Sequence, residues 1–296
     1  MSIFEGSAVA LVTPFKKDGS VNKDKLFELV EYHIENETDA IVVCGTTGEK
    51  PTLKVDEHLD AIKWCVEAAK GRIPIIAGTG SNDTDHSIYM STTAAATGAD
   101  ALLLSSPYYN KATQNGLIAS FSAIADAAGI PCILYNVPSR TGVNIQPETA
   151  VTLARTCENI VAIKEASGDI SQIAKLAALA DGCIDIYSGN DDQITPVLSL
   201  GGKGVISVLA NIAPKDTHDL VMSYLNGSPA ESTRLQLKAN ALVEALFCEV
   251  NPIPVKAAMN FMGMDVGSLR LPLTEMEPQN KEKLKKAMID YGLKLA

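Results

Sequence analysis

Lys164 is the residue whose type and position most directly suggest chemistry. It follows the apolar run 160–163 and precedes the polar segment 165–169 (EASGD). A lysine at the carboxyl end of a buried strand is poorly solvated, and the loss of hydration lowers its pKa. The neutral amine is then a nucleophile that forms Schiff bases with carbonyl substrates. The alternative is a side chain that reaches solvent and takes no part in chemistry.

A second segment with chemical potential is 45–49 (GTTGE), which follows the apolar run 40–44. Its glycines permit a tight turn in which backbone N–H groups and the hydroxyls of Thr46 and Thr47 face one way. Such an arrangement suits a carboxylate. An ordinary strand-to-helix loop with threonine caps is the alternative.

Tyrosines and one arginine form the third group of candidates. Tyr135 ends an apolar run and precedes the segment 136–142 (NVPSRTG), which contains Arg140. A tyrosine in this position can act as a general acid or base if its hydroxyl joins a proton relay. Arg140 could bind a carboxylate through two hydrogen bonds, or simply lie at the surface. The adjacent Tyr108 and Tyr109 lie in a loop and are typical of an interface.

The order of apolar and amphipathic segments predicts how these residues are positioned. Eight apolar runs lack strict alternation, as strands buried on both faces do. They are 8–12, 40–44, 73–77, 101–104, 131–135, 160–163, 184–187 and 204–209. Between them lie segments of helical spacing, for example Leu26, Leu29, Val30 and His33. Strand and helix alternate eight times, which predicts an α/β fold, a (β/α)₈ barrel.

The main alternative fold is an open, doubly wound sheet, which normally carries a glycine-rich fingerprint after its first strand. Here residues 13–15 (TPF) stand there instead. In a barrel the active site lies at the carboxyl ends of the strands, where the segments described above fall. Residues 188–190 (SGN) and Ile206 come at the ends of the last two strands. Residues 201–204 (GGKG) precede the eighth strand, so we assign them to a turn at the opposite end.

Further helical sequence follows the eighth unit. Leu235, Ala239, Leu242 and Leu246 share one helical face, residues 251–254 (NPIP) break the chain, and a lysine-rich helix is expected from about 280 to the end. We therefore predict a barrel over residues 1–226 and a C-terminal helical extension over residues 227–296.

Composition limits the class of protein. Of 296 residues, 46% are hydrophobic and 20% charged, as in a globular enzyme, and the net charge of −10 argues against nucleic acid or an anionic membrane as partner. The six cysteines are scattered, with no pattern typical of a metal site. We see neither a signal peptide nor a run long enough to span a membrane, which indicates a cytoplasmic protein.

Three motifs, 45–49, 135–142 and 160–169, occur in order at the expected strand ends, and together they resemble the dihydrodipicolinate synthase family. This family is one of the pyruvate-dependent Schiff-base aldolases, which include N-acetylneuraminate lyase. The resemblance covers nearly the whole chain. It implies condensation of pyruvate with L-aspartate 4-semialdehyde to 4-hydroxy-tetrahydrodipicolinate, in the diaminopimelate route to lysine. It also implies a homotetramer built as a dimer of dimers, with no metal or organic cofactor.

The resemblance assigns four catalytic residues. Lys164 would form the imine with pyruvate, and Tyr135 would donate and accept protons. Thr46 and Tyr109 would complete the relay, with Tyr109 reaching in from the neighbouring subunit across the tight interface.

The same resemblance assigns the substrate contacts. Thr47 would hold the pyruvate carboxylate, with the Ile206 backbone and Gly189 beside it. Arg140 would take the carboxylate of the semialdehyde. A sugar-acid aldolase of the same superfamily is the nearest alternative, but it would need hydroxyl-binding groups at Arg140 and Thr141. A barrel that binds a small acid without turnover is the other alternative, and the complete catalytic set argues against it.

The chain departs from the family where lysine-inhibited members bind their effector. Three positions agree with the regulatory pattern: His58, Asn82 and Tyr108. Four depart from it: Lys50, Pro51, Val55 and His86. An added cation near a site for a cationic amino acid should weaken binding, so we expect little or no inhibition by lysine.

Overall fold

A computed structural model describes residues 2–296, and its centre is a closed barrel of eight parallel strands. Each strand pairs with its neighbours in chain order, and β1 also pairs with β8. The predicted (β/α)₈ barrel is therefore confirmed. The strands are β1 (Gly6–Ala10), β2 (Ala40–Val43), β3 (Ile75–Gly78), β4 (Ala101–Ser105), β5 (Cys132–Asn136), β6 (Ile160–Glu165), β7 (Asp185–Ser188) and β8 (Gly204–Ser207).

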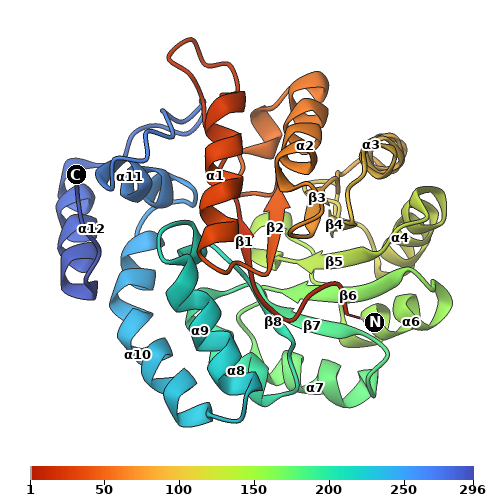
Figure 1. The fold of residues 1–296 in the computed structure, drawn as a ribbon. Helices are drawn as coiled ribbons and strands as arrows, with labels where there is room; N and C mark the ends of the chain where they lie inside the picture. Colours follow the sequence, from red (N-terminus) through yellow and green to blue (C-terminus); the bar gives the residue numbers. More distant parts are fainter. Residues whose placement is uncertain (1) are drawn as a thin grey trace.

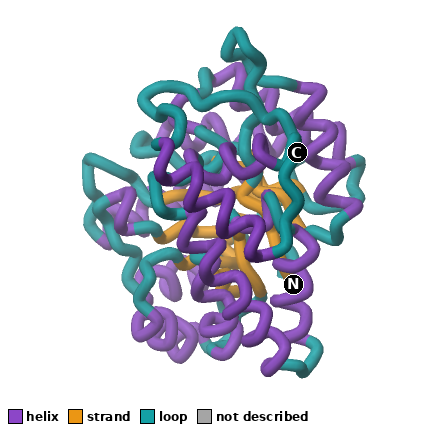
Figure 2. The backbone as a smooth tube through the Cα atoms, turned by 90° about the vertical axis from the view of Figure 1, so that its left-hand side faces the viewer, coloured by secondary structure: helices purple, strands orange, loops and turns teal. Residues whose placement is uncertain are grey.

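Helices surround the strands, as Figures 1 and 2 show. They are α1 (Lys23–Glu35), α2 (Val55–Ala69), α3 (Thr84–Thr97), α4 (Gln114–Ala128), α5 (Pro138–Thr141), α6 (Pro147–Thr156), α7 (Ile170–Ala180), α8 (Ile194–Ser199) and α9 (Pro214–Leu225). Short 3₁₀ turns lie at η1 (Lys50–Thr52), η2 (Asp191–Gln193) and η3 (Leu209–Asn211). In α1, the predicted face of Leu26, Leu29, Val30 and His33 is the buried one.

Residues along each strand face the barrel interior and the helix layer in turn. In β5, Ile133 and Tyr135 pack inside the barrel, whereas Cys132 and Leu134 pack against the helices. Both environments are apolar, which explains why the sequence shows no polar alternation. The same alternation decides which strand-end residues reach the mouth of the barrel.

The predicted eighth strand, 204–209, is too long by two residues, because β8 ends at Ser207. The N–H groups of Val208 and Leu209 donate to Asp191 Oδ2, at 3.0 and 2.9 Å, and are not available to a neighbouring strand. Residues 201–203 of the predicted turn connect α8 to β8, whereas Gly204 is already the first residue of β8. Lys203 pairs with Glu5 at 2.8 Å, just before β1. This turn lies at the amino ends of the strands.

Three helices follow the barrel: α10 (Pro229–Leu246), α11 (Ile253–Phe261) and α12 (Pro278–Tyr291). They gather on one side of the barrel (Figure 1), with α10 packed against α9 and α12. The last helix does not run to the chain end as predicted. It stops at Tyr291, because Gly292 takes φ 108°, a left-handed conformation that ends a helix.

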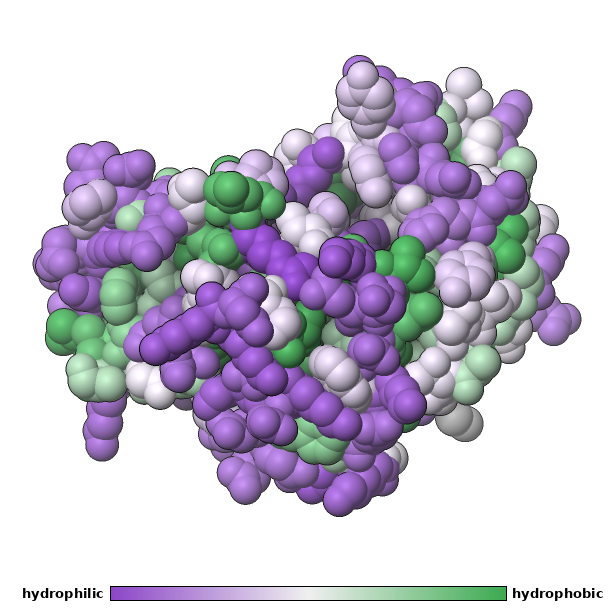
Figure 3. Space-filling view, turned by 90° about the horizontal axis from the view of Figure 1, so that it is seen from above, coloured by the Kyte–Doolittle hydropathy of each residue, from purple (hydrophilic) through white to green (hydrophobic). Residues whose placement is uncertain are grey.

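Polar side chains cover most of the face seen in Figure 3, and apolar side chains appear there only in small separate groups. Among residues 2–296, no helix combines the length and the apolar character that crossing a membrane requires.

Candidate active site

Lys164 and Tyr135 form the centre of the site. They are register partners on the adjacent strands β6 and β5, so their side chains lie on the same side of the sheet. The Nζ atom of Lys164 lies 4.6 Å from the centroid of the Tyr135 ring. The sequence predicted both residues at strand ends, and the structure brings them together.

The Lys164 side chain is buried and lacks a close partner. Only 5% of the residue is exposed, and Nζ makes no hydrogen bond or ion pair with any described residue. Burial lowers the pKa of Lys164 to about 8; the Arg140 charge acts in the same direction and the Asp191 carboxylate opposes it. About a tenth of the amine is therefore neutral at pH 7, far more than for an ordinary lysine, and the neutral form is the one that a Schiff-base nucleophile requires.

Asp191 is a residue of the site that was not expected from the sequence. This residue is buried in η2, directly after β7, where its Oδ2 accepts the two N–H groups that follow β8. Burial raises the pKa of its carboxyl group, and Lys164 and the hydrogen bonds lower it. An acidic residue after a strand is a usable sequence signal, but the adjacent Asp192 carries the same signal. Only the fold shows which carboxylate faces inward.

The loop after β2 is held in a strained shape at both ends. Cys44 and Glu49 take φ 56° and 53°, a region unusual for side chains other than glycine and common at functional sites. The Thr13 hydroxyl donates to the carbonyl oxygen of Gly48 at 2.6 Å, where an added Cβ would meet Thr13 Oγ1 at 3.1 Å. The loop thereby presents its two threonines at the barrel mouth.

Thr46 is the residue of this loop that lies near the tyrosine, and both line the same two cavities. Burial raises the pKa of the Tyr135 hydroxyl, while the Arg140 charge and the Thr46 side chain lower it. Neighbouring hydroxyl groups can pass a proton from one to the other. The relay through Thr46 and Tyr135 therefore stays a prediction.

Thr47 and Arg140 meet at Asn251, which lies between α10 and α11. Asn251 Nδ2 donates to Thr47 Oγ1 at 3.0 Å, and Arg140 Nη2 donates to the Asn251 carbonyl oxygen at 3.2 Å. The C-terminal extension therefore contributes directly to the mouth of the barrel. In the sequence Asn251 is visible only as part of a helix break, because nothing local indicates this long-range contact.

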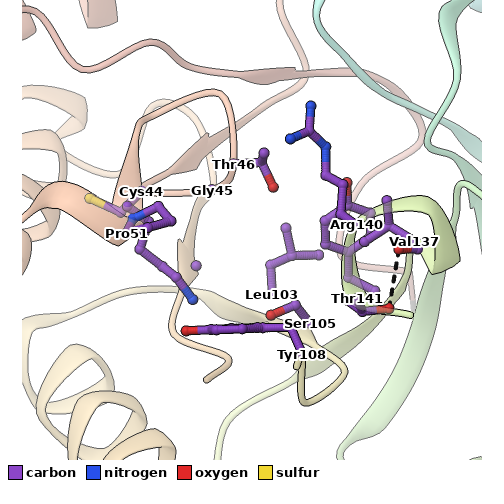
Figure 4. A pocket seen from close by; sticks show the side chains of 13 residues that line it. Cys44, Gly45, Thr46, Pro51, Leu103, Ser105, Tyr108, Val137, Arg140 and Thr141 are labelled. Carbon is purple, nitrogen blue, oxygen red and sulfur yellow. Dashed lines mark hydrogen bonds between the residues drawn. The ribbon is translucent and has the colours of Figure 1, made fainter. Parts of the chain in front are cut away.

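These residues line two adjoining cavities of about 240 and 200 Å³. Figure 4 shows the first, in which Thr46 and Arg140 lie toward one end and Tyr108 toward the other. The second cavity also contains Lys164 and Thr47. Residues that line both are Gly45, Thr46, Leu103, Tyr135, Val137 and Arg140. Together the cavities can hold a small keto acid at Lys164 and a second small acid near Arg140.

Gly189 leaves the room that Lys164 needs. A Cβ added at Gly189 would lie 2.6 Å from Ala166 Cβ and 3.1 Å from Lys164 Cε. Any larger residue must therefore shift Ala166, and it also crowds the Lys164 side chain. This is a steric reason for glycine at a position that the family resemblance places beside pyruvate.

Two candidates lie outside the cavities. The side chain of Ile206 is fully buried inside the barrel and lines neither cavity. Tyr109 is 91% exposed, with φ 72°, and also lines neither. Within residues 2–296 its hydroxyl makes no hydrogen bond. A large aromatic ring held at the surface in a strained backbone conformation is typical of an interface.

The ends of β5 and β6 are fixed from outside the barrel. Asn136 Nδ2 donates to both Glu165 oxygens at 3.1 Å, and Ser167 N donates to Glu165 Oε1 at 2.7 Å. These outward residues directly follow Tyr135 and Lys164 in sequence. Their buried network therefore holds the two inward side chains in position.

The β2 loop is also tied to the C-terminal extension through Glu49. Lys256 Nζ, on α11, lies 2.7 Å from Glu49 Oε1, and both side chains are 1% exposed. Glu49 Oε2 accepts the N–H of Arg270 at 2.9 Å. Lys256 Nζ also lies 4.2 Å from the centroid of the Phe15 ring. A buried ion pair thus links the loop that carries Thr46 to helix α11.

Lys50 lies between the first cavity and a smaller one of about 140 Å³. The smaller cavity is also lined by Val55, His58, His86 and Tyr108. Lys50 Nζ donates to the carbonyl oxygen of Gly80 and forms no ion pair within residues 2–296. Burial lowers the pKa of Lys50 to about 8.

A closed (β/α)₈ barrel with an unpaired, desolvated lysine beside a tyrosine at the strand ends belongs to the class of barrels that can form Schiff bases. The sequence model of the Dihydrodipicolinate synthetase family matches residues 3–290, so the chain belongs to this family.

Known relatives are similar to this chain over nearly its full length. The 4-hydroxy-tetrahydrodipicolinate synthase of Caldicellulosiruptor bescii is 58% identical and covers 99% of both chains. The dihydrodipicolinate synthase structure from Aquifex aeolicus has a TM-score of 0.96 at 44% identity and covers 99% of both chains. The chloride-inhibited dihydrodipicolinate synthase from Acinetobacter baumannii, solved with pyruvate, has a TM-score of 0.96 at 46% identity, covering 98% of this chain and 99% of that one.

Proposed function

We propose that this chain condenses pyruvate with L-aspartate 4-semialdehyde to give 4-hydroxy-tetrahydrodipicolinate. The name of its relative from Caldicellulosiruptor bescii supports the proposal. The observation that carries it is the Lys164 amine, which is buried, unpaired among the described residues and 4.6 Å from the Tyr135 ring. This reaction supplies an intermediate of the diaminopimelate route to lysine.

The first step of the proposed mechanism is imine formation. The neutral Lys164 amine attacks the carbonyl carbon of pyruvate, a C–N bond forms, and one water leaves. Tyr135 donates the proton that the departing oxygen needs and recovers a proton through Thr46. Thr47 holds the pyruvate carboxylate, and the protonated imine stays near Asp191, whose carboxylate offsets its charge.

The second step forms the carbon–carbon bond. The protonated imine acts as an electron sink, so the pyruvate methyl group loses a proton to the Tyr135 relay and becomes an enamine. The enamine carbon attacks the aldehyde carbon of the semialdehyde, whose oxygen takes the proton back from the relay, while Arg140 binds the carboxylate of that substrate. The amino group of the semialdehyde then attacks the imine carbon, closes the ring and releases Lys164. The reaction as a whole loses one water and needs no metal or organic cofactor.

The assembly and setting are proposed with the same reaction. The protein acts as a homotetramer, a dimer of dimers, in the cytoplasm, without nucleic acid or membrane as partner. Tyr109 reaches across the tight interface to the neighbouring site, and its exposure and strained backbone support this role. Residues 1–226 serve as the catalytic barrel, and residues 227–296 serve as the extension that braces its mouth. The backbone of Ile206, together with Gly189, lies beside the bound pyruvate.

The test is covalent trapping. Borohydride reduction in the presence of pyruvate, followed by peptide mass analysis, should place one adduct on Lys164. Supplying L-aspartate 4-semialdehyde should then yield the cyclic product, whereas sugar-acid controls should not turn over. An adduct on another lysine, or turnover of the sugar acids alone, would reject the proposal.

A further inference from the structure

The contact between Asn251 and Thr47 controls which way a hydroxyl proton can point. Both residues are buried, at 6% and 3% exposed, and Asn251 Nδ2 donates to Thr47 Oγ1 at 3.0 Å. No residue in the described part of the chain accepts the proton of Thr47. Thr47 and Asn251 both line the cavity that contains Lys164.

A threonine hydroxyl carries one proton and two lone pairs, so it can accept one hydrogen bond and donate another. Because Asn251 supplies the donor, Thr47 acts as acceptor on that side and keeps its own proton for the cavity. An O–H that points into a cavity suits a carboxylate, whereas an oxygen lone pair there would repel it.

The opposite orientation of the amide is less favourable. In the observed arrangement Asn251 Oδ1 is the buried atom without a partner. Reversing the amide would turn that position into an unpaired NH₂ group, and buried donors without partners are rarer and costlier than under-satisfied carbonyls.

We infer that Asn251 is a positioning residue that fixes Thr47 as the hydrogen-bond donor to the pyruvate carboxylate. The inference rests on the proposed function and adds a residue from the C-terminal extension to substrate recognition. The role should affect the binding of pyruvate and not the binding of the semialdehyde. Arg140 contacts the main-chain oxygen of Asn251, so a change of the Asn251 side chain leaves that contact available.

Asn251→Asp reverses the donor and acceptor roles and is the most informative variant. A carboxylate at this position accepts the Thr47 proton and places a negative charge beside the pyruvate carboxylate. The pyruvate concentration for half-maximal imine formation should rise about a hundredfold or more, against about three- to tenfold for Asn251→Ala. The apparent affinity for the semialdehyde should change little in either variant. The melting temperature should change little in Asn251→Ala and fall in Asn251→Asp, because that variant buries a carboxylate without a cation.

Two further measurements distinguish this role from a purely structural one. A protonated aspartate can donate again, so pyruvate binding by Asn251→Asp should recover, relative to the unmodified protein, as the pH falls. In a Thr47→Val background, where no hydroxyl is left to orient, Asn251→Ala should add no further loss. Thr47→Ser keeps the hydroxyl and should retain most of the affinity.

Three outcomes would overturn the inference. In the first, the unmodified protein forms the imine normally and Asn251→Asp shows an unchanged dependence on pyruvate. That outcome rejects the role of Asn251 but leaves the proposed function standing. Independent losses in the Thr47→Val background would reject that role as well. If the unmodified protein forms no imine with pyruvate, the proposed function fails, and the role of Asn251 fails with it.

Discussion

Tyr135 and Lys164 are register partners at the ends of two adjacent parallel strands, and Lys164 Nζ lies 4.6 Å from the Tyr135 ring centroid. The next residue on each strand, Asn136 and Glu165, faces outward, where the two side chains hydrogen-bond at 3.1 Å. The strand ends are therefore locked together from outside while the amine and the phenol face the cavity. A rigid sheet holds both groups with little loss of precision.

The first prediction is a pH dependence of imine formation. Burial lowers the pKa of Lys164 to about 8, and only the neutral amine attacks. The rate at fixed pyruvate should therefore rise with pH, level off above about 8, and fall about tenfold for each pH unit well below that value. Borohydride trapping at a series of pH values measures this rate.

Lys50→Met is the matched control, because Lys50 also has a pKa of about 8 but takes no part in the proposed chemistry. A midpoint that moved in the control would assign the titration to Lys50.

The second prediction concerns Arg140→Ala. A charge-assisted pair with a carboxylate contributes roughly 1.5–3 kcal/mol, so kcat/KM for the semialdehyde should fall about ten- to a hundredfold. Imine formation with pyruvate should persist. Because the Arg140 charge lowers the pKa of Lys164, the midpoint of that step should move to higher pH. Arg155→Ala, on α6, is a control at another exposed arginine. Equal losses in both steps would show that Arg140 supports the fold instead.

The fold could be predicted because apolar runs and helical spacing repeat eight times, and a parallel barrel is the simplest way to bury them. The first and last residues of individual strands and helices were harder to predict. Residues 208 and 209 are as apolar as a strand, yet the distant Asp191 takes their N–H groups. The last helix stops early because a single glycine, Gly292, takes a left-handed conformation. Tertiary hydrogen bonds and local backbone geometry of this kind leave little trace in hydrophobic periodicity.

The candidate site was only partly predictable, for a related reason. Lys164 and Thr46 follow apolar runs and Tyr135 ends one, and a position at the end of a strand is visible in a sequence. Asn251 and Lys256 contact the β2 loop across more than two hundred residues, at sequence separations of 204 and 207, and no local pattern indicates these contacts. Such residues emerge only when the C-terminal helices are placed on the barrel.

The third prediction is that Tyr109 acts across a subunit boundary. Tyr109→Phe and Lys164→Ala proteins should each be nearly inactive. After dissociation and random re-association of an equal mixture, about a quarter of the sites would combine an intact Lys164 with an intact Tyr109 from the partner. About a quarter of the activity of the unmodified protein should therefore return. Tyr89→Phe, another exposed tyrosine at 52%, should be active alone and is the control for the loss of a surface hydroxyl. No recovery after proven subunit mixing would place Tyr109 in its own subunit's site or outside the chemistry.

The fourth prediction concerns the buried pair of Glu49 and Lys256. Lys256→Met leaves the Glu49 carboxylate buried without its cation, which should lower the free energy of unfolding by about 3–5 kcal/mol. Adding Glu49→Gln should recover part of that loss, because a neutral amide can still accept the Arg270 N–H. Lys63→Met, which removes an exposed partner of Glu67 at 4.0 Å, should change stability by less than about 1 kcal/mol. Denaturant unfolding measures all of these variants. Similar free energies of unfolding for the Lys256 and Lys63 variants would show that the buried pair does not stabilise the fold.

The last prediction is that free lysine inhibits this protein weakly or not at all. In the family pattern the effector pocket involves the positions of His58, His86 and Tyr108, which here line the cavity of about 140 Å³. Lys50 lines the same cavity, bonds to the Gly80 carbonyl, and pairs with neither Glu49 nor Asp56.

A second ammonium group at 4–6 Å from Lys50 would cost on the order of 1 kcal/mol or more, even with solvent screening. His86 adds no negative charge where an acidic partner for the effector is expected. Activity at saturating pyruvate should therefore stay nearly constant as lysine is raised into the millimolar range. Lys50→Ala removes the competing cation and should shift any residual inhibition to lower lysine concentrations, whereas Lys54→Ala, an exposed neighbour, should not. Strong inhibition of the unmodified protein by sub-millimolar lysine would show that His58, Asn82 and Tyr108 suffice for effector binding.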